Sequence, residues 1–415
     1  MNRLVRSSSR KFIDCVNLLP PWIQRTASKK PRKAGADQSA GEIPAAVAAL
    51  MIIGCCLFTG CSPDDRRARL TELQCYPPGI KLNSAQARQQ IVIQATYDDG
   101  VTQDVTARAK LSLGNARLAR VVKEVVSPVA DGETELRVTF GGRSQIVPLS
   151  VCGATAGRPV SFKLDVMPVF AKAGCNSGAC HGASRGKDGF HLSLFGFDPD
   201  GDYYRLTREQ IGRRINLAIP AESLIVQKGL GAVQHTGGVR FTTNSALCQT
   251  LIRWLDAGAK TDPTNVAGLA GVEIFPTSAV MEGSNTAQHF IVRARYSDGT
   301  ERDVTPLAIF ISNNDATAKA GEDGLVTAGQ RGEAFIQARF GEFNVGAQII
   351  VIPKNLAWQW PAEITANNYI DEAVHAKLKK LRLTPSGVCD DATFFGGPIS
   401  ISSANCRRRT KCRSF

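Results

Sequence analysis

An internal repeat limits the fold of this 415-residue chain more than any other feature of its sequence. Residues Tyr97–Thr106 and Tyr296–Thr305 share the pattern Y-x-D-G-x-x-x-D-V-T, and each is preceded by an alternating apolar and polar run. Such alternation is typical of a strand with one buried face, and Asp-Gly is a common turn between antiparallel strands. The repeat therefore predicts two similar all-β domains, each a sandwich of short antiparallel strands.

Both repeats resemble the bacterial Ig-like group 2 domain, and the likeness covers residues 72–153 and 271–353. This resemblance implies a role in spacing or adhesion rather than catalysis. Asp104 and Asp303 lie near the end of the shared pattern. Aspartates in turns commonly accept hydrogen bonds from their own backbone, which we expect here; the alternative is that they bind a metal.

The positive charge of the chain is concentrated at its two ends. The formal net charge is +13; nine Lys or Arg against two Asp in residues 1–41, together with five Lys or Arg in residues 407–413, account for twelve of these charges. The long segment between them is close to neutral. It therefore lacks the basic surface by which proteins bind nucleic acid phosphates, and we expect no nucleic acid partner.

A basic stretch followed by an apolar run, Ile43–Gly60, precedes Cys61. This order is typical of a secretory leader, so we assign residues 1–61 to one. Cleavage before Cys61 would match a bacterial lipoprotein signal, in which lipid on that cysteine tethers the protein; the alternative is an uncleaved membrane-spanning helix of near-minimal length. Either predicts an exported, membrane-anchored protein of the periplasm or cell surface, where disulfides and c-type haem are permitted.

Two cysteines and a histidine between the repeats carry the clearest chemistry. Covalent haem attachment uses two thiols and a histidine directly after the second, and Cys175, Cys180 and His181 supply this set. The usual spacing is C-x-x-C-H, whereas four residues separate the cysteines here. We expect Gly178 to allow the resulting bulge. From spacing alone, a disulfide between Cys175 and Cys180 is the alternative.

Residues 163–260 resemble the planctomycete cytochrome c-like domain. The likeness rests on the cysteine motif and on the segments Gly189–Leu194, Pro220–Leu224 and Trp254–Ala259. It implies a mainly α fold with one covalent haem c on Cys175 and Cys180, and His181 as the proximal iron ligand. It also implies that Phe190, Leu194, Phe197, Leu224 and Trp254 line the haem or form a plain core.

The sixth iron ligand departs from the family pattern. The family commonly supplies a methionine, but no methionine lies between Met167 and Met281. His235 stands at the matching place and is the candidate distal ligand, which would make the iron bis-histidine and lower its reduction potential. The alternatives are that His235 is a solvated loop residue, or that His191 takes this position.

The carboxyl end begins with a helical pattern and then changes character. Residues 364–394 contain an amphipathic run and resemble the start of a large domain of unknown function found in long planctomycete proteins. The likeness stops abruptly, and residues 395–415 become rich in Arg and Cys without periodicity. We expect a truncated helical domain followed by an aberrant tail.

Together these features predict a multidomain chain in which two all-β Ig-like sandwiches flank a mainly α cytochrome c-like domain. The leading hypothesis is an exported, membrane-tethered c-type haem protein that transfers single electrons to or from an unidentified redox partner protein, as a carrier rather than a catalyst. No catalytic residues are predicted. The alternative is a non-catalytic surface or adhesion protein in which Cys175 and Cys180 form a disulfide and no haem is bound.

Overall fold

The computed structural model describes residues 68–387 and 389–393. The predicted leader with Cys61 and the tail 395–415 lie outside these residues. Within the part of the chain that the structure describes, no helix is long and apolar enough to cross a membrane.

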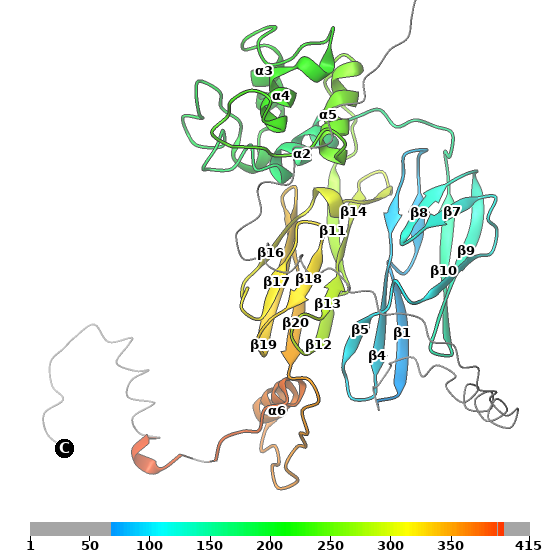
Figure 1. The fold of residues 1–415 in the computed structure, drawn as a ribbon, viewed down its shortest axis with the longest axis vertical. Helices are drawn as coiled ribbons and strands as arrows, with labels where there is room; N and C mark the ends of the chain where they lie inside the picture. The colour runs from blue at the N-terminus through cyan, green and yellow to red at the C-terminus, as the bar shows by residue number, and fades with distance from the viewer. Residues whose placement is uncertain (1–67, 388, 394–415) are drawn as a thin grey trace, which may run out of the picture. The chain divides into compact units, whose positions relative to one another are not determined.

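The first sandwich spans residues 70–151 and contains ten strands in three sheets (blue to cyan, Figure 1). The sheets have the orders β1-β4-β5, β2-β10-β9-β6 and β3-β8-β7. The strands are β1 (Leu70–Tyr76), β2 (Ile80–Leu82), β3 (Gln89–Gln90), β4 (Val92–Tyr97), β5 (Thr102–Asp104), β6 (Lys110–Leu113), β7 (Ala119–Val122), β8 (Val125–Pro128), β9 (Gly132–Phe140) and β10 (Arg143–Val151).

The second sandwich spans residues 269–352 and repeats this arrangement, with the sheet orders β11-β14-β15, β12-β20-β19-β16 and β13-β18-β17. The strands are β11 (Leu269–Phe275), β12 (Ser278–Glu282), β13 (Ala287–His289), β14 (Ile291–Tyr296), β15 (Glu301–Asp303), β16 (Ile309–Ser312), β17 (Ala318–Ala320), β18 (Leu325–Ala328), β19 (Gly332–Phe340) and β20 (Phe343–Ile352). The sequence repeat is therefore a structural repeat, strand for strand.

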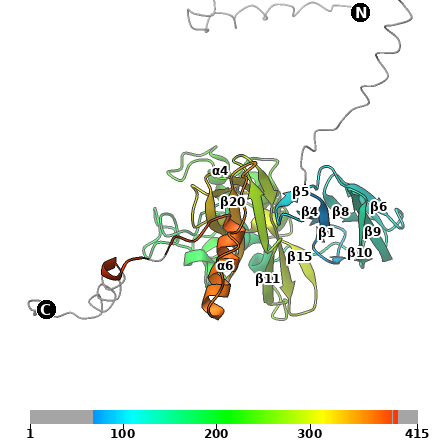
Figure 2. The same cartoon turned by 90° about the horizontal axis from the view of Figure 1, so that it is seen from below.

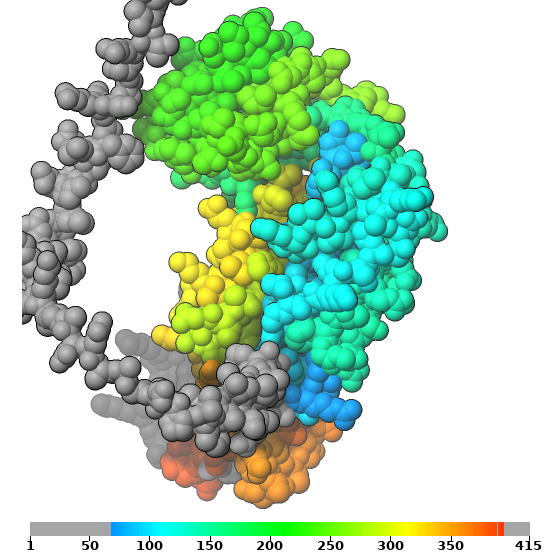
Figure 3. Space-filling view, turned by 45° about the vertical axis from the view of Figure 1, so that its right-hand side comes forward, coloured from blue at the N-terminus to red at the C-terminus, as the bar shows by residue number. Residues whose placement is uncertain are grey.

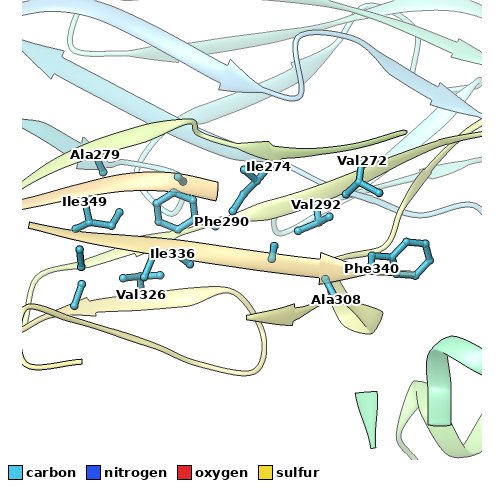
Figure 4. Packing of buried hydrophobic residues seen from close by; sticks show 14 of the residues in the cluster. Val272, Ile274, Ala279, Phe290, Val292, Ala308, Val326, Ile336, Phe340 and Ile349 are labelled. Atoms are coloured by element: carbon cyan, nitrogen blue, oxygen red, sulfur yellow. The ribbon is translucent and has the colours of Figure 1, made fainter. Parts of the chain in front are cut away.

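Alternating side chains build the core of each sandwich. Along β19 the buried residues Ala334, Ile336 and Ala338 alternate with more exposed neighbours, as expected for a strand with one face in the core. They pack with Ile274, Phe290 and other apolar side chains of the facing strands (Figure 4). The turn after β4, like that after β14, uses a glycine at positive φ, +79° at both Gly100 and Gly299.

The two sandwiches contact each other through equivalent residues. Asp104 accepts a hydrogen bond from the backbone N–H of His289 (2.9 Å), and its counterpart Asp303 accepts one from the N–H of Gln90 (2.7 Å). In each pair, residues at matching repeat positions exchange roles. This reciprocity is the signature of a two-fold interface, as in an isologous dimer, but it occurs here within one chain.

Further contacts follow the same two-fold rule. Gln94 donates to the carbonyl of Ser278 (3.1 Å), and its counterpart Arg293 donates to that of Gly79 (3.4 Å). The equivalent residues Tyr76 and Phe275 stack on each other, with ring centres 5.7 Å apart. Because a residue that meets its own counterpart lies on the symmetry axis, this stack marks the centre of the interface.

The middle segment, residues 160–262, corrects the expected fold class. Its elements are the π-turn η1 (Phe162–Val166), the short 3-10 turns η2 (Leu194–Gly196) and η3 (Pro220–Glu222), and the helices α2 (Met167–Lys172), α3 (Pro199–Thr207), α4 (Leu224–Leu230) and α5 (Ala246–Asp256). These four α-helices have 6, 9, 7 and 11 residues, and turns and loops connect them. The prediction of a mainly α cytochrome c-like domain is therefore wrong.

Two glycines explain where two of the short helices of the middle segment end. Gly174 and Gly231 adopt positive φ (+72° and +74°) just after α2 and α4, where they end the helical geometry. The segment nevertheless has its own core, in which Trp254 and Leu251 of α5 are fully buried against Phe162. It forms one continuous body in the space-filling view (green, Figure 3).

The first residues of the middle segment are held by contacts with the second sandwich. Asp165 is buried and forms ion pairs with Arg158 (2.7 Å) and with Arg302 of β15. Lys172, at the end of α2, donates to the carbonyl of Ala308 (2.6 Å) beside the 3-10 turn η4 (Thr305–Leu307). The helix that leads into the cysteine motif is therefore held on the sandwich.

Helix α6 (Tyr369–Leu381) lies beside β20 (Figure 2). Asn368 caps its first turn by accepting hydrogen bonds from the N–H groups of Ile370 and Asp371. Lys377 forms an ion pair with Glu333 of β19. None of the residues of α6 is buried, and Tyr369 is 77% exposed.

Candidate functional site

The cysteine motif follows α2 as a series of tight turns. The backbone N–H of Cys175 donates to the carbonyl of Phe170, and the N–H of His181 donates to that of Cys175 (3.0 Å). A Cβ at Gly182 would lie 2.1 Å from the carbonyl oxygen of Asn176, whereas one at Gly178 would meet nothing closer than 3.8 Å. The glycine that the turn requires is therefore Gly182, and Gly178 does not have the role that we expected for it.

Cys175 and Cys180 are both free thiols in the structure, so the alternative disulfide is not formed there. Burial raises the pKa of Cys175 to about 11. The guanidinium of Arg240 lies 3.8 Å from the Cys180 sulfur and is also close enough to oppose part of the Cys175 shift. At neutral pH Cys175 is therefore a protonated thiol in an apolar setting.

One ring nitrogen of His181 is occupied by the protein. Nδ1 lies 3.0 Å from the carbonyl oxygen of Phe190, so Nδ1 carries the proton and donates to it. The lone pair of Nε2 is then available as a ligand, which is the tautomer that a backbone carbonyl commonly fixes at metal-binding histidines. Desolvation by burial lowers the pKa of His181, and the nearby His235 and Lys228 lower it further, which favours this neutral form.

His235 lies opposite His181. The two ring centres are 6.2 Å apart and the ring planes differ by 9°. In the described part of the chain, Nδ1 of His235 is buried without a hydrogen-bond partner. Gly237 allows the ring to sit there, because a Cβ on that residue would lie 2.5 Å from Cε1 of His235.

A pocket of about 240 Å³ joins these residues. Cys175, His181 and His235 line it, so the structure brings three of the four predicted haem residues to one cavity; Cys180 is not among the lining residues. The other lining residues are Phe170, Lys187, Asp188, Gly189, Phe190, Leu192, Gln210, Arg213, Arg214, Leu224, Ile225, Lys228, Gly229 and Phe241. Its deep wall is apolar, since Phe170, Leu192 and Phe241 are buried.

Several residues named from the sequence lie elsewhere. Phe190 and Leu224 line the pocket as expected. Trp254 belongs instead to the core, where its Nε1 donates to the carbonyl of Lys260. Leu194 and Phe197 are 40% and 78% exposed, and His191 is absent from the described residues that line the pocket.

Phe170 and Phe241 are lining residues that the sequence analysis missed. Phe170 lies in the apolar run before the motif and could have been suspected. Phe241 comes from a loop without a motif, and no sequence signal distinguishes it.

These residues fit a haem held by two imidazoles. Two imidazoles that held one iron between them would have ring centres about 6 Å apart, because each metal–nitrogen bond is about 2 Å long and each ring centre lies about 1 Å beyond its nitrogen. The separation of His181 and His235 agrees with this distance. An apolar cavity beside a free thiol, Cys175, suits the vinyl edge of the porphyrin.

Asp104 and Asp303 hydrogen-bond their own turns, as predicted. Oδ1 of Asp104 accepts from the N–H of Thr106 (3.0 Å), and Oδ1 of Asp303 accepts from that of Thr305 (2.9 Å). Their Oδ2 atoms make the contacts between the sandwiches described above, which the sequence did not indicate.

No protein family and no curated protein matches the chain. Among solved structures, domains 5–6 of the S-layer protein SbsC cover 68% of this chain and 99% of their own, with 10% identity and a TM-score of 0.26. Human protocadherin-24 EC1-2 covers 69% of this chain and 100% of its own, with 6% identity and a TM-score of 0.15. Similarities this low carry no argument about function, so the resemblances inferred from the sequence remain predictions.

Proposed function

We propose that this chain is a non-catalytic, exported surface protein whose paired sandwiches support a pocket for one haem c. The leader that ends at Cys61 supports export and attachment to a membrane. The two-fold contact between the sandwiches supports a rigid spacer, because polar contacts and a ring stack join them at several points. Spacing and presentation need no catalytic group.

The placement of His181 and His235 carries the haem part of the proposal. His181 would be the proximal iron ligand through Nε2, and His235 the distal one. Cys175 and Cys180 would hold the porphyrin through thioether bonds. Bound in this way, haem would supply single-electron transfer, with a low reduction potential because both axial ligands are imidazoles.

The surface role without haem is the second candidate, and the two sandwiches favour it, since they contain all the strands of the described residues. In that case Cys175 and Cys180 would be a disulfide or remain free thiols. The two candidates differ in one measurable property, covalent haem.

A pyridine haemochrome spectrum of the full chain tests the proposal, with protein purified from a host that attaches c-type haem. We expect a c-type α-band that survives acid-acetone extraction and disappears in the variant Cys175→Ala/Cys180→Ala. A folded, colourless wild type would instead support the surface role alone, and a thiol titration would then show whether 175 and 180 are oxidised.

The distal ligand is tested separately. We expect His235→Ala to convert the low-spin absorption spectrum to a high-spin one, because the iron loses its sixth ligand. His191→Ala is the matched control, since His191 lies in the same segment but does not line the pocket. An unchanged low-spin spectrum in His235→Ala would refute the bis-histidine assignment.

A further inference from the structure

Cationic side chains surround the open side of the histidine pocket. Lys187, Arg213 and Lys228 line it, and Arg213 is exposed while the two lysines are half-buried. The exposed lining residues Asp188 and Gln210 belong to this side as well, whereas Phe170 and Phe241 form the deep wall. The pocket therefore has an apolar end and a positively charged mouth.

Arg214 also lines the pocket, but the protein already uses its charge. It is 5% exposed, donates to the carbonyl of Arg205 (2.8 Å) and forms an ion pair with Glu209 (3.0 Å). Its guanidinium also lies over the ring of Phe190, 4.5 Å from the ring centre. Arg214 is therefore a structural cation that holds the pocket wall.

The other three cations have no such partner. Within the described residues, no ion pair involves Lys187, Arg213 or Lys228, and Asp188 is the one acidic residue among those that line the pocket. Three positive charges beside an apolar cavity attract an anion, and the field is stronger where the wall excludes water. A ligand that matched the pocket would thus be apolar at one end and doubly anionic at the other.

We propose that Lys187, Arg213 and Lys228 bind the two propionate carboxylates of haem and so orient its vinyl edge toward Cys175. This inference rests on the proposed haem function and adds the residues that select the orientation. Carboxylates paired with Lys or Arg form charge-assisted hydrogen bonds, which are stronger than neutral ones. Cys175 lines the same cavity, so anchoring the propionates at the mouth leaves the vinyl edge for its thiol.

The test compares haem with haem dimethyl ester, in which both carboxylates are blocked. Both are titrated into the full-length Cys175→Ala/Cys180→Ala chain, where binding is reversible, and followed by absorption. We expect the ester to bind about 10- to 100-fold more weakly than haem, the range for losing hydrogen bonds to charged groups. When the triple variant Lys187→Gln/Arg213→Gln/Lys228→Gln is added to these two substitutions, the affinity for haem should fall to that for the ester.

A variant at a distant cation controls for general loss of charge. Arg253 of α5 hydrogen-bonds within its own helix and does not line the pocket, so Arg253→Gln should keep the preference for haem. Retained ester binding shows that the triple variant is folded.

The outcomes separate the two proposals. Equal affinity for haem and ester in the chain that keeps Lys187, Arg213 and Lys228 would overturn this inference and leave the haem function standing. A triple variant that still prefers haem would have the same meaning. Failure of both ligands to bind would overturn the haem function and this inference with it.

Discussion

At the scale of single residues, two glycines allow close contacts around the pocket. Gly237 contacts the ring of His235, and the turn at Gly182 presses against the carbonyl of Asn176. Both positions lack the room for a side chain. Gly237 therefore limits where the ring of His235 can lie, and Gly182 allows the tight turn of the cysteine motif.

Gly237→Ala should displace His235, because the new Cβ would lie 2.5 Å from its Cε1. We expect partial conversion of the low-spin spectrum to high spin and a haem affinity about tenfold lower, which corresponds to about 1.4 kcal/mol. Gly178→Ala is the control, since its Cβ would meet only Leu194, at an ordinary contact distance of 3.8 Å. If both variants keep the wild-type spectrum, the close approach at Gly237 does not position the ligand.

The sequence identified some residues of the site and missed others for a physical reason. Cys175 and His181 are neighbours in a motif, and His235 could be inferred from the missing methionine. Lys228 comes from α4, and Phe241 comes from the loop after it and packs against Gly229 of that helix. No local pattern records that packing.

At the scale of elements, helix α5 is a central part of the core of the middle segment. Helix α5 is capped by Ser245, whose side chain accepts a hydrogen bond from the N–H of Cys248 (3.2 Å), and it contributes three buried apolar residues around Trp254. The other helices have nine residues or fewer, and two of them, α2 and α4, pack against it. The resemblance at Trp254–Ala259 implies a helix that ends here, but it does not indicate how much loop surrounds it.

Leu251→Ala tests this role of α5. Leu251 is fully buried, and removing its side chain should lower the free energy of unfolding of the middle segment by about 2–5 kcal/mol. The measurement is a urea titration followed by tryptophan fluorescence. Ile211→Ala, at a residue that is 82% exposed, should change it by less than about 0.5 kcal/mol. Similar midpoints for the two variants would mean that α5 is not a stabilising element.

At the scale of the whole molecule, the contact between the sandwiches combines a ring stack with charged and polar pairs. Lys81 pairs with Glu301 (2.9 Å), and at the equivalent place Thr102 accepts from the N–H of Val280 (2.9 Å). The repeat is visible in the sequence, but its mutual packing is not. Most of these contacts use backbone groups, which every residue carries, so they leave no composition signal.

The pair Asp104–His289 makes the stability of this contact depend on pH. The pKa of His289 is raised, chiefly by its hydrogen bond to Asp104. Burial acts to raise the pKa of Asp104, but hydrogen bonds from His289 and Thr106 leave it lowered. Because the pKa of His289 is raised in the folded protein, its full contribution to the free energy of unfolding is present below pH about 6.5. That contribution is lost as pH rises through the folded pKa. The lowered pKa of Asp104 contributes to the free energy of unfolding at higher pH, and that contribution is lost only in acid.

We therefore expect wild type to lose stability between pH 6 and pH 8.5 relative to His289→Gln. The side chain of His289 is 41% exposed, so solvent screening limits the difference to about 0.5 kcal/mol. Urea midpoints at the two pH values measure it, and His375→Gln on α6 is the control. Parallel changes in wild type and His289→Gln would show that the pair contributes nothing.

The two-fold contact also has a consequence for solubility. β5 and β15 each lie at one edge of a three-stranded sheet, and an uncovered edge strand invites pairing with another molecule. Here β5 packs against β12 and β13, and β15 against β2 and β3, so each sandwich covers the edge of the other. Separating them would expose two aggregation-prone edges at once. Protection of β5 and β15 is thus a property of the pair, which neither sandwich would have alone.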